Sequence, residues 1–154
     1  MENRKTVLIT GSNRGIGLDF VRLDRKEYWN VIATTRVVEE VKELQELQPW
    51  KILALDVSSE VLIFNLAESL LDITIDLLII YNAAILYNRG MEESTTDDLM
   101  DQFRINAVGP FLLTRALLRN MRLGIQKNGT AKLAQITSKW KSIELNQQST
   151  HYGY

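Results

Sequence analysis

A glycine-rich segment near the N-terminus has the residue types and spacing of a phosphate-binding turn. It covers residues 10–17, reads TGSNRGIG, and lies between a short apolar run and a segment with helical spacing. Gly11 allows a tight turn, Gly15 lets the backbone approach a pyrophosphate, and Gly17 permits close packing of a helix on a strand. The first N–H groups of a helix, together with its dipole, attract phosphate oxygens. Rather than a turn without a ligand, we therefore expect a dinucleotide site formed by Gly11, Ser12, Asn13, Arg14, Gly15, Ile16 and Gly17.

The kind of nucleotide depends on the residues that end the second expected strand. NAD-binding domains usually carry Asp or Glu there, which accepts a hydrogen bond from the ribose 2′-hydroxyl. Here residues 34–36 read TTR, and the next carboxylate is Glu39. Arg36, assisted by Arg14, can pair with a 2′-phosphate, because a guanidinium group matches phosphate oxygens in geometry and charge. The pattern favours NADP over NAD; the alternative is that both arginines are solvated surface charges.

Alternating strand and helix patterns predict the scaffold that positions these residues. Five short apolar runs are typical of strands buried on both faces: Lys5–Thr10, Val31–Thr35, Lys51–Leu55, Leu77–Tyr81 and Lys132–Thr137. Helical spacing fills the intervals, with the longest helix expected at about Asp97–Leu123. We therefore expect one domain over residues 1–154, with a Rossmann-type doubly wound parallel sheet of about five strands in the order 3-2-1-4-5. Ligands of such sheets bind at the carboxyl ends of the strands.

Composition excludes several classes of function. The 154 residues carry 18 basic and 19 acidic side chains, so the net charge gives no indication of a nucleic-acid partner. The absence of cysteine and the single histidine, His151, exclude a disulfide framework and a multi-histidine metal centre. The most apolar stretch, Leu71–Ile80, contains two aspartates, so we expect no membrane span. These features favour a soluble, cytoplasmic protein.

The glycine-rich turn and four later segments resemble, in order, the motifs of the short-chain dehydrogenase/reductase family. The turn has the family's TGxxxGxG spacing. The other matches are Asp56 and Val57, where the family holds the adenine; Asn82, Ala83 and Ala84, in the place of its NNAG; Asn106, its helix asparagine; and Ser138, its catalytic serine. Residues 13–14, 32–36 and 142–144 look most like the C-factor-like and carbonyl-reductase-like branch.

The resemblance implies hydride transfer between NADP and the carbonyl group of a small aldehyde or ketone. In the family a tyrosine donates the proton, a serine hydrogen-bonds the carbonyl oxygen, and a lysine lowers the tyrosine pKa while holding the ribose. The helix asparagine supports a water relay to that lysine. Asn106, Ser138 and Tyr154 match three of these roles, with Ser142 and Tyr152 as alternatives for the serine and the tyrosine.

The sequence departs from the family pattern in two places. Ala84 replaces a glycine where backbone passes close to the cofactor, and Tyr154, the last residue, is followed by no lysine. We therefore expect the N-terminal part of a longer reductase, whose later segments would supply the lysine. The alternative function is a nucleotide-binding module without turnover, or an inactive fragment. In the family the helix expected at 97–123 contributes to a subunit interface, so we expect a homodimer or an adhesive surface there.

Overall fold

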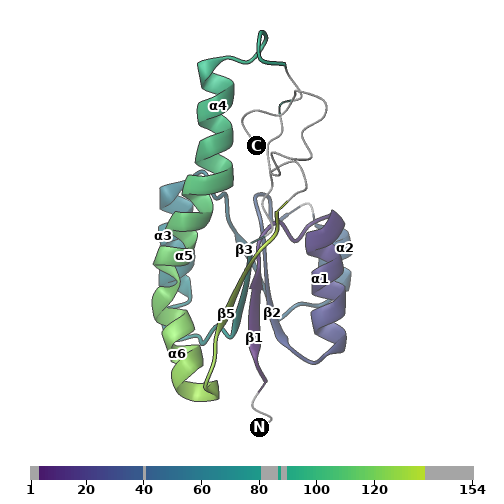
Figure 1. Ribbon diagram of the computed structural model, residues 1–154. Coiled ribbons are helices and arrows are strands. Elements are labelled where there is room, and N and C mark those ends of the chain that lie inside the picture. Colours follow the sequence, from purple (N-terminus) through teal and green to yellow (C-terminus); the bar gives the residue numbers. More distant parts are fainter. Residues whose placement is uncertain (1–3, 40, 81–86, 88–89, 138–154) are drawn as a thin grey trace.

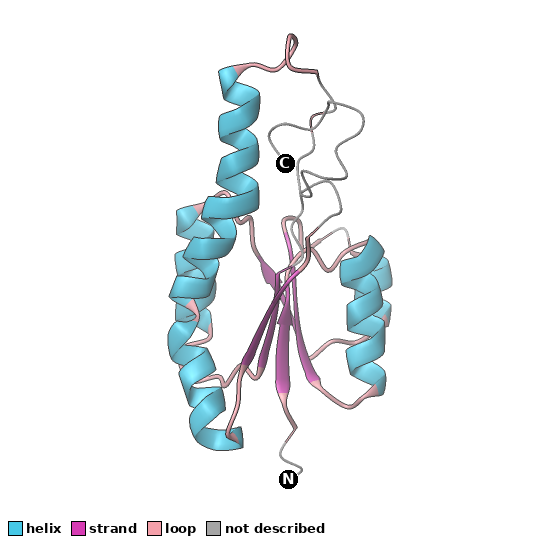
Figure 2. Cartoon of the chain, in the orientation of Figure 1, coloured by secondary structure: helices cyan, strands magenta, loops and turns pink. Residues whose placement is uncertain are grey.

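The computed structural model describes residues 4–39, 41–80, 87 and 90–137. Within them, a five-stranded parallel sheet lies between two layers of helices (Figure 1). The strands are β1 (Thr6–Ile9), β2 (Asn30–Thr35), β3 (Lys51–Ala54), β4 (Leu77–Ile80) and β5 (Lys132–Gln135). Their order is β3-β2-β1-β4-β5, which confirms the predicted topology. Figure 2 shows the strands running side by side, so that their carboxyl ends meet at one edge of the sheet.

The central strands are apolar because both of their faces are covered. Val7 of β1 lies in register with Val31 of β2 and with Leu77 of β4. Successive side chains of a strand point to opposite faces. Accordingly, Val7 and Ile9 join the core under one helical layer, whereas Leu8 joins the core under the other. All three side chains are fully buried.

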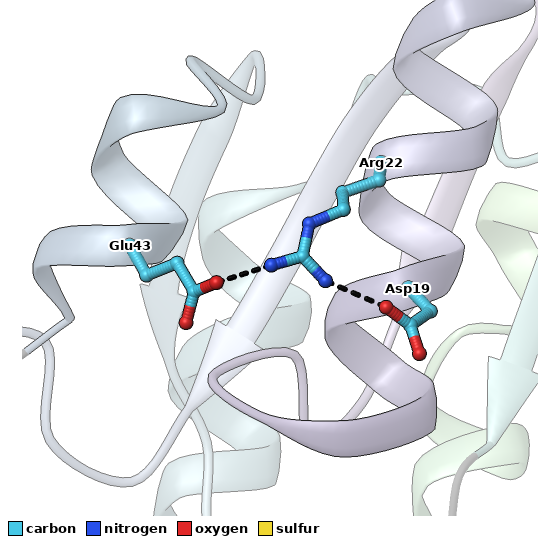
Figure 3. Close-up of polar contacts among 3 residues, drawn as sticks. All are labelled: Asp19, Arg22 and Glu43. Carbon is cyan, nitrogen blue, oxygen red and sulfur yellow. Dashed lines mark hydrogen bonds and ion pairs between the residues drawn. The ribbon is translucent and has the colours of Figure 1, made fainter.

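One layer consists of α1 (Gly15–Lys26) and the short α2 (Lys42–Glu46). The core that contains Val7 and Ile9 also includes Leu18 and Val21 of α1 and Leu44 of α2. On the solvent side, Arg22 donates to Asp19 at 2.6 Å and to Glu43 of α2, which ties the two helices together (Figure 3). Such an exposed pair contributes little to stability, so the layer depends mainly on its apolar contacts.

The other layer contains α3 (Glu60–Ser69), α5 (Gly109–Ala116) and α6 (Leu118–Asn128). Ile63 and Leu66 of α3 pack with Leu113 and Leu117 against the sheet. The backbone N–H of Leu62 donates to Ser59 Oγ at 3.3 Å, which caps the start of α3. This layer carries the chain from β3 to β4 and from the region after β4 to β5.

The single helix predicted at 97–123 is wrong in detail. The structure has α4 (Thr96–Phe103), a π-helical turn η1 (Arg104–Val108), and then α5 and α6, which are separated at Leu117. A capping box starts α4, because Thr95 Oγ1 accepts from Asp98 N at 3.1 Å and Asp98 Oδ2 accepts from Thr95 N at 3.0 Å. Asp98 is thus a capping residue of α4.

Figure 1 shows α4 extending beyond the carboxyl edge of the sheet, while α5 lies beside α3. The turn η1, which joins α4 to α5, therefore lies near that edge. No helix in the described part of the chain is long and apolar enough to cross a membrane.

Candidate nucleotide-binding site

Hydrogen bonds between neighbouring strands fix the glycine-rich turn. Ser12 N donates to Thr34 O at 2.9 Å, and Ser12 Oγ donates to Ile9 O at 2.8 Å. In return, Thr34 N donates to Ser12 Oγ at 3.2 Å. Both Ser12 and Thr34 are fully buried. The turn after β1 and the end of β2 are thus one rigid unit.

Ser12 therefore supports the glycine-rich turn from inside the protein. Its N–H and its hydroxyl are both committed to the β1 and β2 backbone. Asn13, Arg14, Gly15 and Ile16 are exposed at the opening of α1. The first N–H groups of a helix lack intrahelical acceptors, so these exposed residues present the donors that suit a phosphate.

The three glycines of the turn meet different constraints. Gly11 and Gly15 have φ values of 61° and 55°, in the left-handed region that favours glycine. A Cβ built on Gly17 would lie 2.2 Å from Gly11 O, so no larger residue fits between helix and turn. A Cβ on Gly15 would meet no atom within 4 Å, so the space over the start of α1 is open among the described residues. The tight turn predicted at Gly11 and the close packing predicted at Gly17 agree with this arrangement, and the approach of a pyrophosphate at Gly15 stays a prediction.

The topology brings Arg36 between the glycine-rich turn and Asp56. Because β2 lies between β1 and β3, the residues that follow these strands are neighbours along one edge. Arg36 and Arg14 are exposed there, and Thr35 is buried with its Oγ1 donating to Val37 O at 3.4 Å. The end of β2 thus offers positive charge and no carboxylate to a ligand.

Asp56 is held in one orientation by the loop that follows it. Its Oδ1 accepts from Ser58 N at 2.9 Å and from Ser58 Oγ at 2.6 Å. Partial burial alone would raise the pKa of the Asp56 carboxyl, but these hydrogen bonds and the charges of Arg36 and Arg104 outweigh burial and lower it. Asp56 is therefore ionised at neutral pH and acts as a fixed acceptor.

Asn106 lies in the π turn η1 and is only 7% exposed. Single π turns within α-helices occur frequently at functional sites. The turn that carries this asparagine contacts the loop of Asp56 through Arg104, which donates to Ser58 O.

The other candidate residues lie outside the described part of the chain. These are Asn82, Ala83 and Ala84, which follow β4, and Ser138, Ser142, Tyr152 and Tyr154, which follow β5. Their roles remain predictions from the sequence. Among the described residues, no group of His, Cys, Asp or Glu could hold a metal ion.

Comparison with known proteins agrees with this geometry. A family model described as short chain dehydrogenase matches residues 5–153. The chain belongs to the short chain dehydrogenase family.

Three relatives illustrate the extent of the similarity to other short chain dehydrogenases. The oxidoreductase YusZ of Bacillus subtilis (strain 168) is 30% identical over 144 residues, which cover 88% of this chain and 49% of YusZ. A short-chain dehydrogenase from Streptomyces avermitilis is 30% identical with a TM-score of 0.77, covering 90% of this chain and 50% of that one. NADPH-bound carbonyl reductase from chicken fatty liver is 29% identical with a TM-score of 0.85, covering 98% and 67%. The chain thus spans about half the length of the first two relatives.

Three residues at this short chain dehydrogenase site were missed by sequence reasoning. Ser58 orients Asp56, Thr34 braces the turn, and Arg104 donates to Ser58 O at 2.9 Å. The Asp-x-Ser spacing at 56–58 is a turn signal that would have identified Ser58. Arg104 has no comparable signal, because its acceptor is a backbone carbonyl distant in sequence.

Proposed function

We propose that this short chain dehydrogenase is an NADP(H)-dependent oxidoreductase that reduces the carbonyl group of a small aldehyde or ketone. One observation carries the proposal. The open glycine-rich turn at the start of α1 lies beside a strand end that carries Arg36 and no carboxylate. The NADPH bound by the chicken carbonyl reductase supports the choice of cofactor.

The described residues fit the adenine half of such a nucleotide. The exposed start of α1 would hold the pyrophosphate through its N–H groups, and the space above Gly15 leaves room for it. Arg14 and Arg36 would pair with the 2′-phosphate, whereas Asp56 and Val57 would contact the adenine. The bound nicotinamide supplies the hydride.

The remaining roles fall to residues that follow β4 and β5 in the sequence. Asn82, Ala83 and Ala84 would line the nicotinamide half of the site. Ser138 would hydrogen-bond the carbonyl oxygen, and Tyr154 would donate the proton to it. Asn106 would support the proton path from its buried position in η1. A nucleotide-binding role without turnover is the alternative, and it is favoured by Ala84, which adds a methyl group at a glycine position of the family.

We expect the chain to bind NADPH at least about tenfold more tightly than NADH, because one charge-assisted phosphate contact contributes about 1.5–3 kcal/mol. Arg36→Ala should remove most of that preference and leave NADH affinity unchanged. Arg119→Ala is the matched control, because it removes the same charge from α6, where Arg119 is paired with the exposed Asp72. Fluorescence titration of both nucleotides measures the effect. Equal affinities in the unaltered chain would contradict the assignment of NADP.

We also propose that α4 and α5 form a homodimer interface. Met100, Phe103 and Phe111 are 59%, 58% and 63% exposed on these helices. Clustered exposed apolar side chains mark interaction surfaces. Light scattering should show a dimer, and Phe111→Glu should convert it to a monomer, whereas Leu23→Glu on exposed α1 should not. A monomer at high concentration for the unaltered chain would rule the interface out.

A further inference from the structure

The π turn η1 is attached at both ends to the loop that carries Asp56. At its start, Arg104 donates through a guanidinium nitrogen to Ser58 O at 2.9 Å. Just after its end, a Cβ built on Gly109 would lie 2.5 Å from Val57 O and 3.0 Å from Val57 Cβ. Gly109 is buried, so the helix backbone lies directly against Val57. The contact between Arg104 and Ser58 joins residues that are 46 positions apart in sequence.

The contact made by Arg104 is linked to the Asp56 carboxylate through Ser58. Arg104 holds the carbonyl of Ser58, and the N–H and hydroxyl of the same serine both donate to Asp56 Oδ1. A shift of Ser58 therefore moves the acceptor that would face the adenine. In the same loop, Val57 can keep its position only while residue 109 has no side chain.

We propose that Arg104 and Gly109 are positioning residues of the adenine site, which hold residues 56–58 against the π turn that carries Asn106. This inference rests on the proposed NADP-binding function. Since Asn106 lies between the two contacts, the same short turn fixes the adenine loop and the candidate catalytic asparagine relative to each other. A change at either contact should then weaken the binding of the adenine half itself.

The first test compares Arg104→Ala, Arg104→Lys and the control Arg119→Ala in the 154-residue chain. The probes are NADPH and adenosine 2′,5′-bisphosphate, which contains only the adenine half. Arg104→Ala should weaken both by a similar factor of about tenfold, since a charge-assisted bond to the loop is lost. Arg104→Lys should recover most of the affinity, because an ammonium group can also donate to Ser58 O. Arg119→Ala should change neither affinity.

The second test uses glycines with the same steric constraint. A Cβ on Gly124 would lie 2.5 Å from Ile75 O, the same distance as that between a Cβ on Gly109 and Val57 O. Gly109→Ala and Gly124→Ala should therefore lower thermal stability alike, but only Gly109→Ala should lower affinity for adenosine 2′,5′-bisphosphate in the folded fraction. If Gly109→Ala does not fold, the Arg104 pair decides the question alone.

The outcomes separate this inference from the proposed function. If the unaltered chain binds neither probe, both are wrong. If it binds both probes and Arg104→Ala stays within about twofold, NADP binding stands and the positioning role is wrong. A loss in Arg104→Ala that Arg119→Ala reproduces would also overturn it, because the effect would then be one of general charge.

Discussion

Gly15→Val is expected to abolish nucleotide binding while the chain remains folded. A Cβ at this position meets no described atom within 4 Å, so valine would extend into the open space at the start of α1 and fill the path of the pyrophosphate. Its φ of 55° also resists a β-branched side chain. Loss of two or more phosphate contacts should weaken NADPH binding more than about a hundredfold. Fluorescence titration measures the affinity, and circular dichroism confirms the fold.

Gly129→Val is the matched control for strain. Gly129 caps the end of α6 with a φ of 80°, and a Cβ there also meets nothing within 4 Å. The strain of a β-branched residue at positive φ is therefore present, but at the C-terminus of a helix remote from the glycine-rich turn. It should lower stability and leave NADPH affinity unchanged. Retained binding in folded Gly15→Val would show that the turn is not the phosphate site.

The three central strands of the sheet were predictable because they are buried on both faces. A run such as Leu77–Ile80 has no polar residues at alternate positions, so its length and apolar character identify a strand of a parallel sheet. Right-handed crossovers then allow few strand orders, and the observed order is among them. The ends of strands were predicted to within about two residues, as is usual where turns begin.

The long helix was predictable only as a helical region. Its apolar spacing suggested one buried face, yet Phe103 is 58% exposed while Leu113 is fully buried. The π turn at Arg104–Val108 inserts a residue into the helical repeat, and α4 extends beyond the sheet. A periodicity argument assumes a constant 3.6-residue turn and a continuous partner surface, and neither holds here.

The candidate site was predictable where a local motif carries it. The turn at 10–17 combines backbone requirements that glycine alone meets at Gly17, and these appear directly in the sequence. The contact from Arg104 to Ser58 O depends instead on how a distant helix packs, and any long polar side chain is compatible with that position in sequence. Contacts of this kind to backbone carbonyls can be identified only from the three-dimensional structure.

The proposed carbonyl reduction depends on a positive charge beside the tyrosine that donates the proton. A free tyrosine has a pKa of about 10, so an unassisted phenol is poorly suited to general acid catalysis near neutral pH. In the family a lysine four positions after the catalytic tyrosine supplies the positive charge that lowers this pKa, and it also holds the nicotinamide ribose. Tyr154, the tyrosine that matches, is the last residue of the sequence.

The 154-residue chain is therefore expected to bind NADPH but to reduce carbonyl compounds slowly. General acid catalysis contributes about 10²–10⁴-fold to a rate, and we expect a loss of at least that size relative to a longer form that continues past Tyr154. The measurement is NADPH consumption by both forms with a panel of aldehydes and ketones. Binding and turnover must be measured on the same samples, so that a failure of the cofactor site is not mistaken for a missing proton donor.

Comparable turnover by the two forms would contradict the assignment of Tyr154. The positive charge would then come from within the sequence, and Lys139 and Lys141 are the lysines nearest to Ser138. Replacing each by Met, which removes the charge at similar length, would identify the one responsible, because only that change should abolish turnover while NADPH affinity is retained. Turnover that survives both replacements would place the proton donor outside the tyrosine–lysine scheme altogether.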